Sequence, residues 1–276
     1  MRFHTRSHIR LALVTLGFVF TAGARAHAQL AVMSNLVEER TASPGERYAG
    51  RITVRNTTDQ RQNARIYQTD WNFAADGTSH TDDPGSSRRS NAPWVHPQMT
   101  RLSIAPGAEV TVAYSVDVPA RDSLRGTYWS MIMIEGVDAP ATAVAAVRDG
   151  RGGGVGIGSV MRYAIQVATH IGGTGSRVVQ FTGVNAVTNA DATVAVNLDV
   201  INTGERGYRP LLWIEVFDAN GVVRAKGKQQ RGLLYPGTSL RQHFDLGALP
   251  HGTYKALVFA DTGVEPVFAS QLALVF

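Results

Sequence analysis

Apolar and polar residues alternate with a period of two through most of the chain. The alternation is clear at 51–55, 110–118 and 194–200. It is typical of β-strands that bury one face and expose the other to water. No stretch beyond the first 28 residues sustains the 3.6-residue period of an amphipathic helix. The sequence therefore predicts an all-β protein.

Turn-forming residue pairs interrupt the alternating runs at short intervals. Asn220-Gly221 stands between the apolar runs 213–217 and 222–225, which predicts a hairpin with a two-residue turn. Many short strands with frequent turns favour sandwiches or barrels. The other pairs are Pro44-Gly45, Asp76-Gly77, Pro84-Gly85, Pro106-Gly107 and Pro236-Gly237.

Four local signals occur in the same order in the two halves of the chain. A strand ending in Asn-Thr, at 52–57 and again at 198–203, is followed by Pro-Gly, by an apolar residue before Pro, and by Gly-Thr-Tyr. We therefore predict two tandem immunoglobulin-like β-sandwiches. They comprise residues 29–172 and 177–276, with a boundary near Gly172–Ser176.

The first 28 residues have the organisation of a signal peptide. A basic start precedes the apolar run 11–20, and Ala26-His27-Ala28 offers the small residues of a cleavage site before Gln29. The run is short for a membrane span, and no later segment approaches about 20 apolar residues. We expect a periplasmic or otherwise extracytoplasmic protein without a stable membrane span.

Removal of this segment changes the charge of the chain. The whole sequence carries 27 basic and 22 acidic residues. Four of the basic residues and none of the acidic ones lie in residues 1–28, so the remainder is close to neutral. Nucleic-acid binding requires clustered Lys and Arg on a retained face, and the sequence shows no such cluster. Nucleic acid is therefore not an expected partner.

The usual patterns of catalytic and metal sites are missing from the sequence. Cysteine is absent, and the five histidines after residue 28 form no i, i+2 or i, i+4 pair. There is no Gly-x-Ser-x-Gly elbow, and the glycine-rich run 150–158 lacks the spacing of a dinucleotide-binding loop. We expect a protein that is not an enzyme and needs no metal or cofactor.

A long loop and a long strand lie between the two halves. Residues 137–159 are rich in Ala and Gly, which predicts a flexible loop, and residues 155–171 alternate as one strand. The apolar face of this strand is the candidate partner-binding surface. Its residues are Val155, Ile157, Met161, Tyr163, Ile165 and Val167.

The four tryptophans offer a different kind of site. A tryptophan in an alternating strand usually belongs to the core, as we expect for Trp129 and Trp213. Trp71 and Trp94 lie near turns and are the better candidates for exposed rings that stack on sugars.

The order of these motifs resembles that of the periplasmic pilus chaperones, the PapD-like family, over most of the chain. The resemblance implies β-strand addition, in which an alternating apolar strand completes the sandwich of a secreted or envelope partner such as a pilus-type subunit. The motifs are Pro44-Gly45-Glu46, 52–56, Asp70-Trp71, Trp94, 102–107 and the strand 155–171.

The family also anchors the terminal carboxylate of its partner with an Arg on the first strand and a Lys on the lending strand. Alignment on Pro44-Gly45-Glu46 puts Glu39 near the Arg position, with Arg40 beside it, and Arg162 near the Lys position. Arg and Lys are not equivalent at such a site. Two alternatives to a chaperone-like protein stay open, namely a structural or adhesive immunoglobulin-like envelope protein and a sugar-binding protein.

Overall fold

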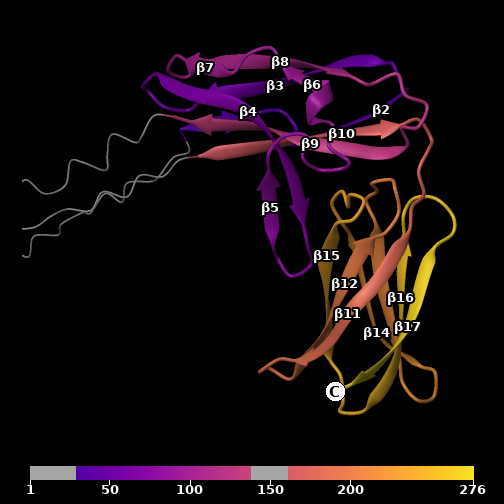
Figure 1. The fold of residues 1–276 in the computed structure, drawn as a ribbon. Coiled ribbons are helices and arrows are strands. Elements are labelled where there is room, and N and C mark those ends of the chain that lie inside the picture. Colours follow the sequence, from indigo (N-terminus) through magenta and orange to yellow (C-terminus); the bar gives the residue numbers. More distant parts are fainter. Residues whose placement is uncertain (1–28, 138–160) are drawn as a thin grey trace, which may run out of the picture.

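A computed structural model describes residues 29–137 and 161–276 as two β-sandwich domains. The first domain (indigo to magenta, with β10 in salmon) lies across the top of Figure 1, and the second (salmon to yellow) lies below it. Strands and one 3₁₀ turn are the regular elements of these residues. The predicted all-β fold with two sandwiches is confirmed. No helix in the described part is long and apolar enough to cross a membrane.

The first domain pairs a sheet of order β1-β3-β8-β6 with a sheet of order β2-β10-β9-β4-β5, and β7 joins the second sheet through β4. The elements are β1 (Leu30–Val32), β2 (Val37–Ala42), β3 (Arg47–Asn56), β4 (Gln62–Phe73), β5 (Ser79–Asp82), η1 (Ala92–Trp94), β6 (Val95–Pro97), β7 (Arg101–Ile104), β8 (Glu109–Asp117), β9 (Gly126–Gly136) and β10 (Arg162–Ile171).

The second domain pairs a sheet of order β11-β12-β15 with a sheet of order β14-β13-β16-β17. Residues 172–178 join the two domains. The strands are β11 (Val179–Thr188), β12 (Thr193–Asn202), β13 (Leu211–Phe217), β14 (Val223–Gln230), β15 (Ser239–Ala248), β16 (Thr253–Asp261) and β17 (Phe268–Val275).

The alternation in the sequence sets the inward face of each strand. Ile52 and Val54 of β3 are fully buried, and so are Val196 and Leu198 of β12, which belong to the cores of the first and second domain. Their neighbours in each strand point outward because successive side chains of a strand alternate between the two faces. Each sandwich therefore has its own core.

The hairpin expected at Asn220-Gly221 joins β13 to β14, but its turn is wider than two residues. The connection spans 218–222, and the Asp218 carboxylate accepts the backbone N–H groups of Asn220 and Val222. Gly221 has a φ of 76°, a left-handed value that favours glycine. The aspartate hence adds two hydrogen bonds that hold the longer turn.

The two domains meet through an aromatic cluster. The rings of Trp129 and Tyr235 stack with centroids 4.6 Å apart, and Ala168 and Leu233 pack beside them. The β4–β5 hairpin extends down from the first domain beside the second (Figure 1), and the N–H of Ala75 donates to Ser239 Oγ at 2.9 Å. This interface positions the second domain against the outward face of the β2-β10-β9-β4 sheet.

Candidate functional site: the open edge of β10

The strand β10 is paired along its whole length on one side and only in part on the other. It runs antiparallel to β9 from Arg162 to Ile171. On the opposite side it runs parallel to β2, and this pairing begins at Gln166, opposite Val37. Among the described residues, no strand pairs with that side of Arg162–Ile165. The first part of β10 is therefore an open sheet edge.

The direction of the backbone groups follows from one hydrogen bond. The N–H of Gln166 donates to the Leu36 carbonyl at 2.8 Å, so the backbone of Gln166 faces the β2 side. Backbone groups of a strand alternate in direction with a period of two. The N–H and C=O groups of Arg162 and Ala164 consequently face the open edge.

The side chains of the predicted partner-binding strand do not all lie on the surface. Ile165 and Val167 are 0% and 1% exposed and lie in the core of the first domain, and the Tyr163 hydroxyl donates to the Leu30 carbonyl at 2.7 Å. The expectation that Ile165 and Val167 contact a partner needs correction, because these side chains fill their own sandwich. Val155 and Ile157 lie outside the described residues.

Exposed apolar side chains flank the open edge. Met161, which immediately precedes β10, is 40% exposed, and its carbonyl accepts the N–H of Gly136. Leu36, whose carbonyl binds Gln166, is 47% exposed, and Val137 is 53% exposed. The open edge thus has apolar surface at both of its ends.

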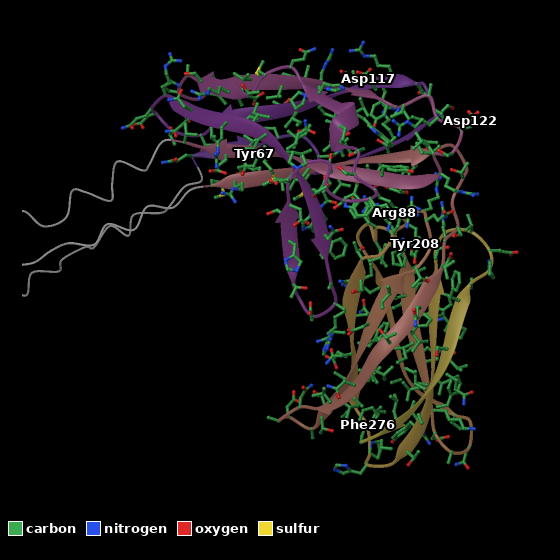
Figure 2. The ribbon with its side chains drawn as sticks, viewed as in Figure 1. Tyr67, Arg88, Asp117, Asp122, Tyr208 and Phe276 are labelled. Atoms are coloured by element: carbon green, nitrogen blue, oxygen red, sulfur yellow. The ribbon has the colours of Figure 1, made fainter. Side chains whose placement is uncertain are left out.

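A polar cluster holds the first residue of the open edge. The Glu135 carboxylate of β9 accepts hydrogen bonds from Arg162 at 2.7 Å, Arg65 at 2.8 Å and the Tyr67 hydroxyl at 2.7 Å (Tyr67 is labelled in Figure 2). The hydrogen bonds from Tyr67, Arg162 and Arg65 lower the pKa of Glu135 to about 2. The charge of Arg162 is therefore engaged inside its own sheet and does not act as a free anchor.

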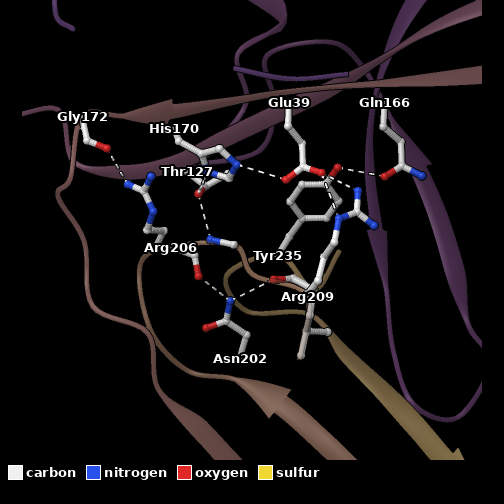
Figure 3. A network of polar contacts seen from close by, with 11 residues as sticks. Glu39, Thr127, Gln166, His170, Gly172, Asn202, Arg206, Arg209 and Tyr235 are labelled. Carbon is white, nitrogen blue, oxygen red and sulfur yellow. Dashed lines mark hydrogen bonds and ion pairs between the residues drawn. The ribbon is translucent and has the colours of Figure 1, made fainter. Parts of the chain in front are cut away.

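A second polar network lies between the domains, on the outward face of the paired part of β10 (Figure 3). Oε2 of Glu39 lies 3.3 Å from Nε2 of His170, and Arg209 of the second domain binds the same carboxylate. Thr127 accepts the N–H of Gly207, so its hydroxyl is free to donate to Nδ1 of His170 at 2.7 Å. Hence Nε2 serves as the donor to Glu39.

This network occupies the place where the family resemblance implies an anchoring Arg. The hydrogen bond from His170 lowers the pKa of Glu39, and Arg209 acts in the same direction against the effect of burial. Glu39 is thus an anion that joins the two domains. Sequence reasoning placed Glu39 but missed His170 and Arg209. Their separation in the chain left no local signal that the three residues meet.

A groove between the domains lies next to the open edge. Its volume is about 480 Å³, and it is bounded by Val37 and Gln166, by Trp71 and Phe73 of β4, and by residues of the second domain. Those residues are Arg209, Arg231, Gly232, Leu233, Ser239, Leu240 and Arg241, and the β4–β5 turn adds Ala74, Ala75 and Gly77. The groove begins where the pairing of β10 with β2 begins.

Arg231 is the arginine of this groove that forms no ion pair among the described residues. Its Nε is buried and has no hydrogen-bond partner among the described residues. The other two arginines are engaged, Arg209 by Glu39 and Arg241 by Asp199. An anionic group entering the groove would meet the positive charge of Arg231, which lines it.

The tryptophans differ from expectation in two places. Trp129 is buried as predicted, but Trp94 is only 9% exposed and packs in the core of the first domain. Trp213, expected in a core, is half-buried at an outward position of β13. Trp71 is half-buried in the interdomain groove. Of the two rings proposed for sugar stacking, only Trp71 has accessible surface.

Neither a protein-family model nor a curated protein sequence matches this chain. Solved structures of pilus chaperones do match. A chaperone–tip adhesin complex of CFA/I fimbriae is 12% identical with a TM-score of 0.45, and covers 88% of this chain and 98% of its own. The CsuC–CsuE chaperone–tip adhesion subunit complex of Acinetobacter baumannii is 12% identical with a TM-score of 0.44, and covers 89% and 98%.

The CupB2 chaperone of Pseudomonas aeruginosa is also 12% identical, with a TM-score of 0.39, and covers 88% of this chain and 100% of its own. At this identity and TM-score the likeness concerns the fold, and what this chain binds must follow from its own residues. In structure, the chain is similar to two-domain PapD-like pilus chaperones over most of its length.

Proposed function

We propose that the protein is an exported, chaperone-like binding protein that captures a strand of a secreted or envelope partner along the open edge of β10. The observation that carries the proposal is the unpaired backbone of Arg162 and Ala164 beside the exposed side chains of Met161 and Leu36. Strand addition uses such an edge, because backbone hydrogen bonds supply affinity and apolar contacts supply specificity.

Within the described residues Arg162–Ile165, the open edge lacks the usual protection against pairing. Natural edge strands are commonly blocked by proline, by bulges or by free charges, which disfavour the approach of another strand. Arg162 is the charged residue of this edge, and Glu135 already binds it within the sheet. Its charge therefore offers little resistance to an incoming strand, and Ala164 adds no bulk.

The interdomain groove gives the incoming chain a defined end. A strand paired with Arg162–Ile165 has to stop where β2 begins at Val37, and the groove opens there. Val37, Trp71 and Phe73 supply apolar walls for a terminal side chain, and Arg231 supplies a positive charge for a carboxylate. A secreted subunit with an unpaired strand, of the pilus type that the sequence motifs imply, has the features that this surface would bind.

The test uses two variants of one position. Ala164→Pro removes the N–H that faces the open edge, and proline is tolerated where a strand N–H has no partner. Ala164→Val keeps this N–H and serves as the matched control. Proteins captured from the native envelope by the wild type should be identified by mass spectrometry. They should be retained by Ala164→Val and lost with Ala164→Pro, while both variants unfold cooperatively.

A contrasting variant checks the assignment of the edge. The backbone of Ala168 faces β2, so Ala168→Pro removes a ladder hydrogen bond from a paired edge and should destabilise the domain clearly more than Ala164→Pro does. Capture that persists in a folded Ala164→Pro protein would remove strand addition at this edge. The structural or adhesive envelope protein would then be the better interpretation.

A further inference from the structure

The two outer faces of the second domain differ in chemistry. The outer face of β11-β12-β15 is polar, with an Asp199–Arg241 ion pair and a hydrogen bond between Asn197 and His243. The outer face of β14-β13-β16-β17 instead presents half-buried apolar side chains at the centre of the sheet. They are Leu211, Trp213 and Phe217 of β13 and Leu257 and Phe259 of β16.

One ring of this apolar face has a free side. Trp213 and Phe259 are register partners on neighbouring strands, with centroids 4.9 Å apart and planes within 11°. Neighbouring strands lie about 4.8 Å apart, so the two rings stand upright and stack across the gap between β13 and β16. Phe259 covers one face of the indole, and the other face is turned toward β14.

A hollow lies on that free face. Its volume is about 530 Å³, and it is lined by Trp213, by Lys226 and Lys228 of β14, and by Glu215 and Asp261, with Leu211, Ile214 and Gly227 completing it. Volumes of roughly 300–1,000 Å³ are usual for small-ligand sites. The hollow is thus a shallow site built around one aromatic wall.

Donors and acceptors are balanced around this wall. The Lys226 ammonium lies 2.8 Å from the Glu215 carboxylate, and Oδ1 of Asp261 accepts the N–H of Gly263. No carboxylate among the described residues pairs with Lys228. Two cations and two anions make the rim neutral, so it complements hydroxyl groups, which both donate and accept, better than a strongly charged ligand.

We propose that this hollow binds a carbohydrate, with one sugar ring stacked on the free face of Trp213. The face of an aromatic ring is electronegative and attracts the weakly positive C–H groups of a sugar. A pyranose of gluco configuration carries its ring substituents equatorially and leaves C–H groups on both faces. Its outward-pointing hydroxyls would reach Lys228, Asp261 and the Lys226–Glu215 pair. β-1,4-linked oligosaccharides of this configuration are the proposed ligands.

The size of the hollow favours a sugar over a folded protein partner. A stable protein interface buries about 800 Å² on each partner, with an apolar centre and a continuous rim. Here four charged side chains stand within the hollow itself, beside the apolar side chains of Leu211 and Trp213, so the hollow has no continuous apolar centre. The site also lies away from the open edge of β10, so it neither requires nor excludes strand addition.

Isothermal titration calorimetry with β-1,4-linked N-acetylglucosamine tetramer and with cellotetraose tests the proposal. At least one of the two should bind the wild-type protein. Trp213→Ala should weaken binding at least ~10-fold, which corresponds to about 1.4 kcal/mol, while Trp213→Phe should restore part of it. Lys228→Ala alters only an exposed side chain and should weaken binding several-fold in a protein with unchanged melting behaviour.

His243→Ala, on the polar outer face of the same domain, is the matched control and should bind as the wild type does. Failure of both tetramers to bind would overturn the proposal, and so would equal binding by the wild type, Trp213→Ala and Lys228→Ala. Sedimentation analysis adds a third arm. A wild-type dimer that Trp213→Ala dissociates would assign the face to self-association and also overturn the proposal.

Discussion

The two parts of β10 share one core face but differ at their edge. Gln166–Ile171 lies between β9 and β2, and Ala168 packs against the second domain. Among the described residues, β9 is the one strand beside Arg162–Ile165, yet Ile165 is as deeply buried as Val167. Whether the side chains of a strand are buried is therefore independent of whether its backbone can pair with another strand.

This difference separates stability from binding along a single strand. The paired part is bound on both edges and on its outward face, so its residues contribute mainly to the fold. The open part keeps its core contacts but leaves the backbone of Arg162 and Ala164 available. Substitutions that remove side chains should thus act on stability in both parts, and only changes of the backbone should separate them.

Ile165→Ala should have the largest effect, although Ile165 belongs to the open part. Its side chain is 0% exposed, so truncation leaves a cavity and should lower the free energy of unfolding by about 2–5 kcal/mol. Urea unfolding followed by fluorescence measures this change. Met161→Ala, four residues earlier and 40% exposed, should stay within about 0.5 kcal/mol. A small effect of Ile165→Ala would mean that the open part is not anchored in the core.

Gln166→Ala should have an intermediate effect at the first residue of the paired part. The hydroxyl of the fully buried Tyr235 donates to Oε1 of Gln166 at 2.8 Å. Removal of the acceptor leaves a buried donor unsatisfied, which costs about 1–3 kcal/mol. In a double-mutant cycle, Tyr235→Phe should remove most of this penalty. Additive effects of the two substitutions would contradict the hydrogen bond between the domains.

The sequence predicted the elements whose environment is local. Alternation identified the strands around 51–55, 110–118 and 194–200, because the period of two directly reflects one buried and one solvent face. The sequence also correctly identified the face formed by the odd-numbered residues of 161–167 as apolar. The predicted contact of Ile165 and Val167 with a partner was wrong, since alternation shows that a face is buried but not whether the chain or a partner buries it.

The interdomain contacts could not be predicted, for a different physical reason. Glu39, His170 and Arg209 meet only because the second domain packs on the outward face of the first. For a related reason, Trp94 lies in a core although exposure was predicted, and Trp213 lies on an outer face although burial was predicted. η1 turns Trp94 into the core, and Trp213 follows the outward register of β13. Proximity to a turn is a weak guide to exposure compared with the register of a strand.

The smallest effect is expected where Glu135 holds the start of the open part. The pKa of this carboxyl is about 2 in the folded protein, below its ordinary value of 4.5. A lowered pKa contributes stability that is complete above about pH 4.5 and is lost as the pH falls toward 2. Since Arg65 and Arg162 are about half exposed, the contribution should be on the order of 1 kcal/mol.

Glu135→Gln should accordingly lower the free energy of unfolding at about pH 6 and approach the wild-type value at about pH 2.5. Urea unfolding of both proteins across this range gives the difference between their free energies of unfolding. The other acidic groups titrate in both proteins, so this difference reports on Glu135. Glu109→Gln, an exposed substitution on β8 whose carboxylate lies 3.9 Å from Arg55, is the control and should differ little from the wild type at any pH. If the difference for Glu135→Gln stayed constant with pH, the open part would be held by its core contacts and its pairing with β9 alone.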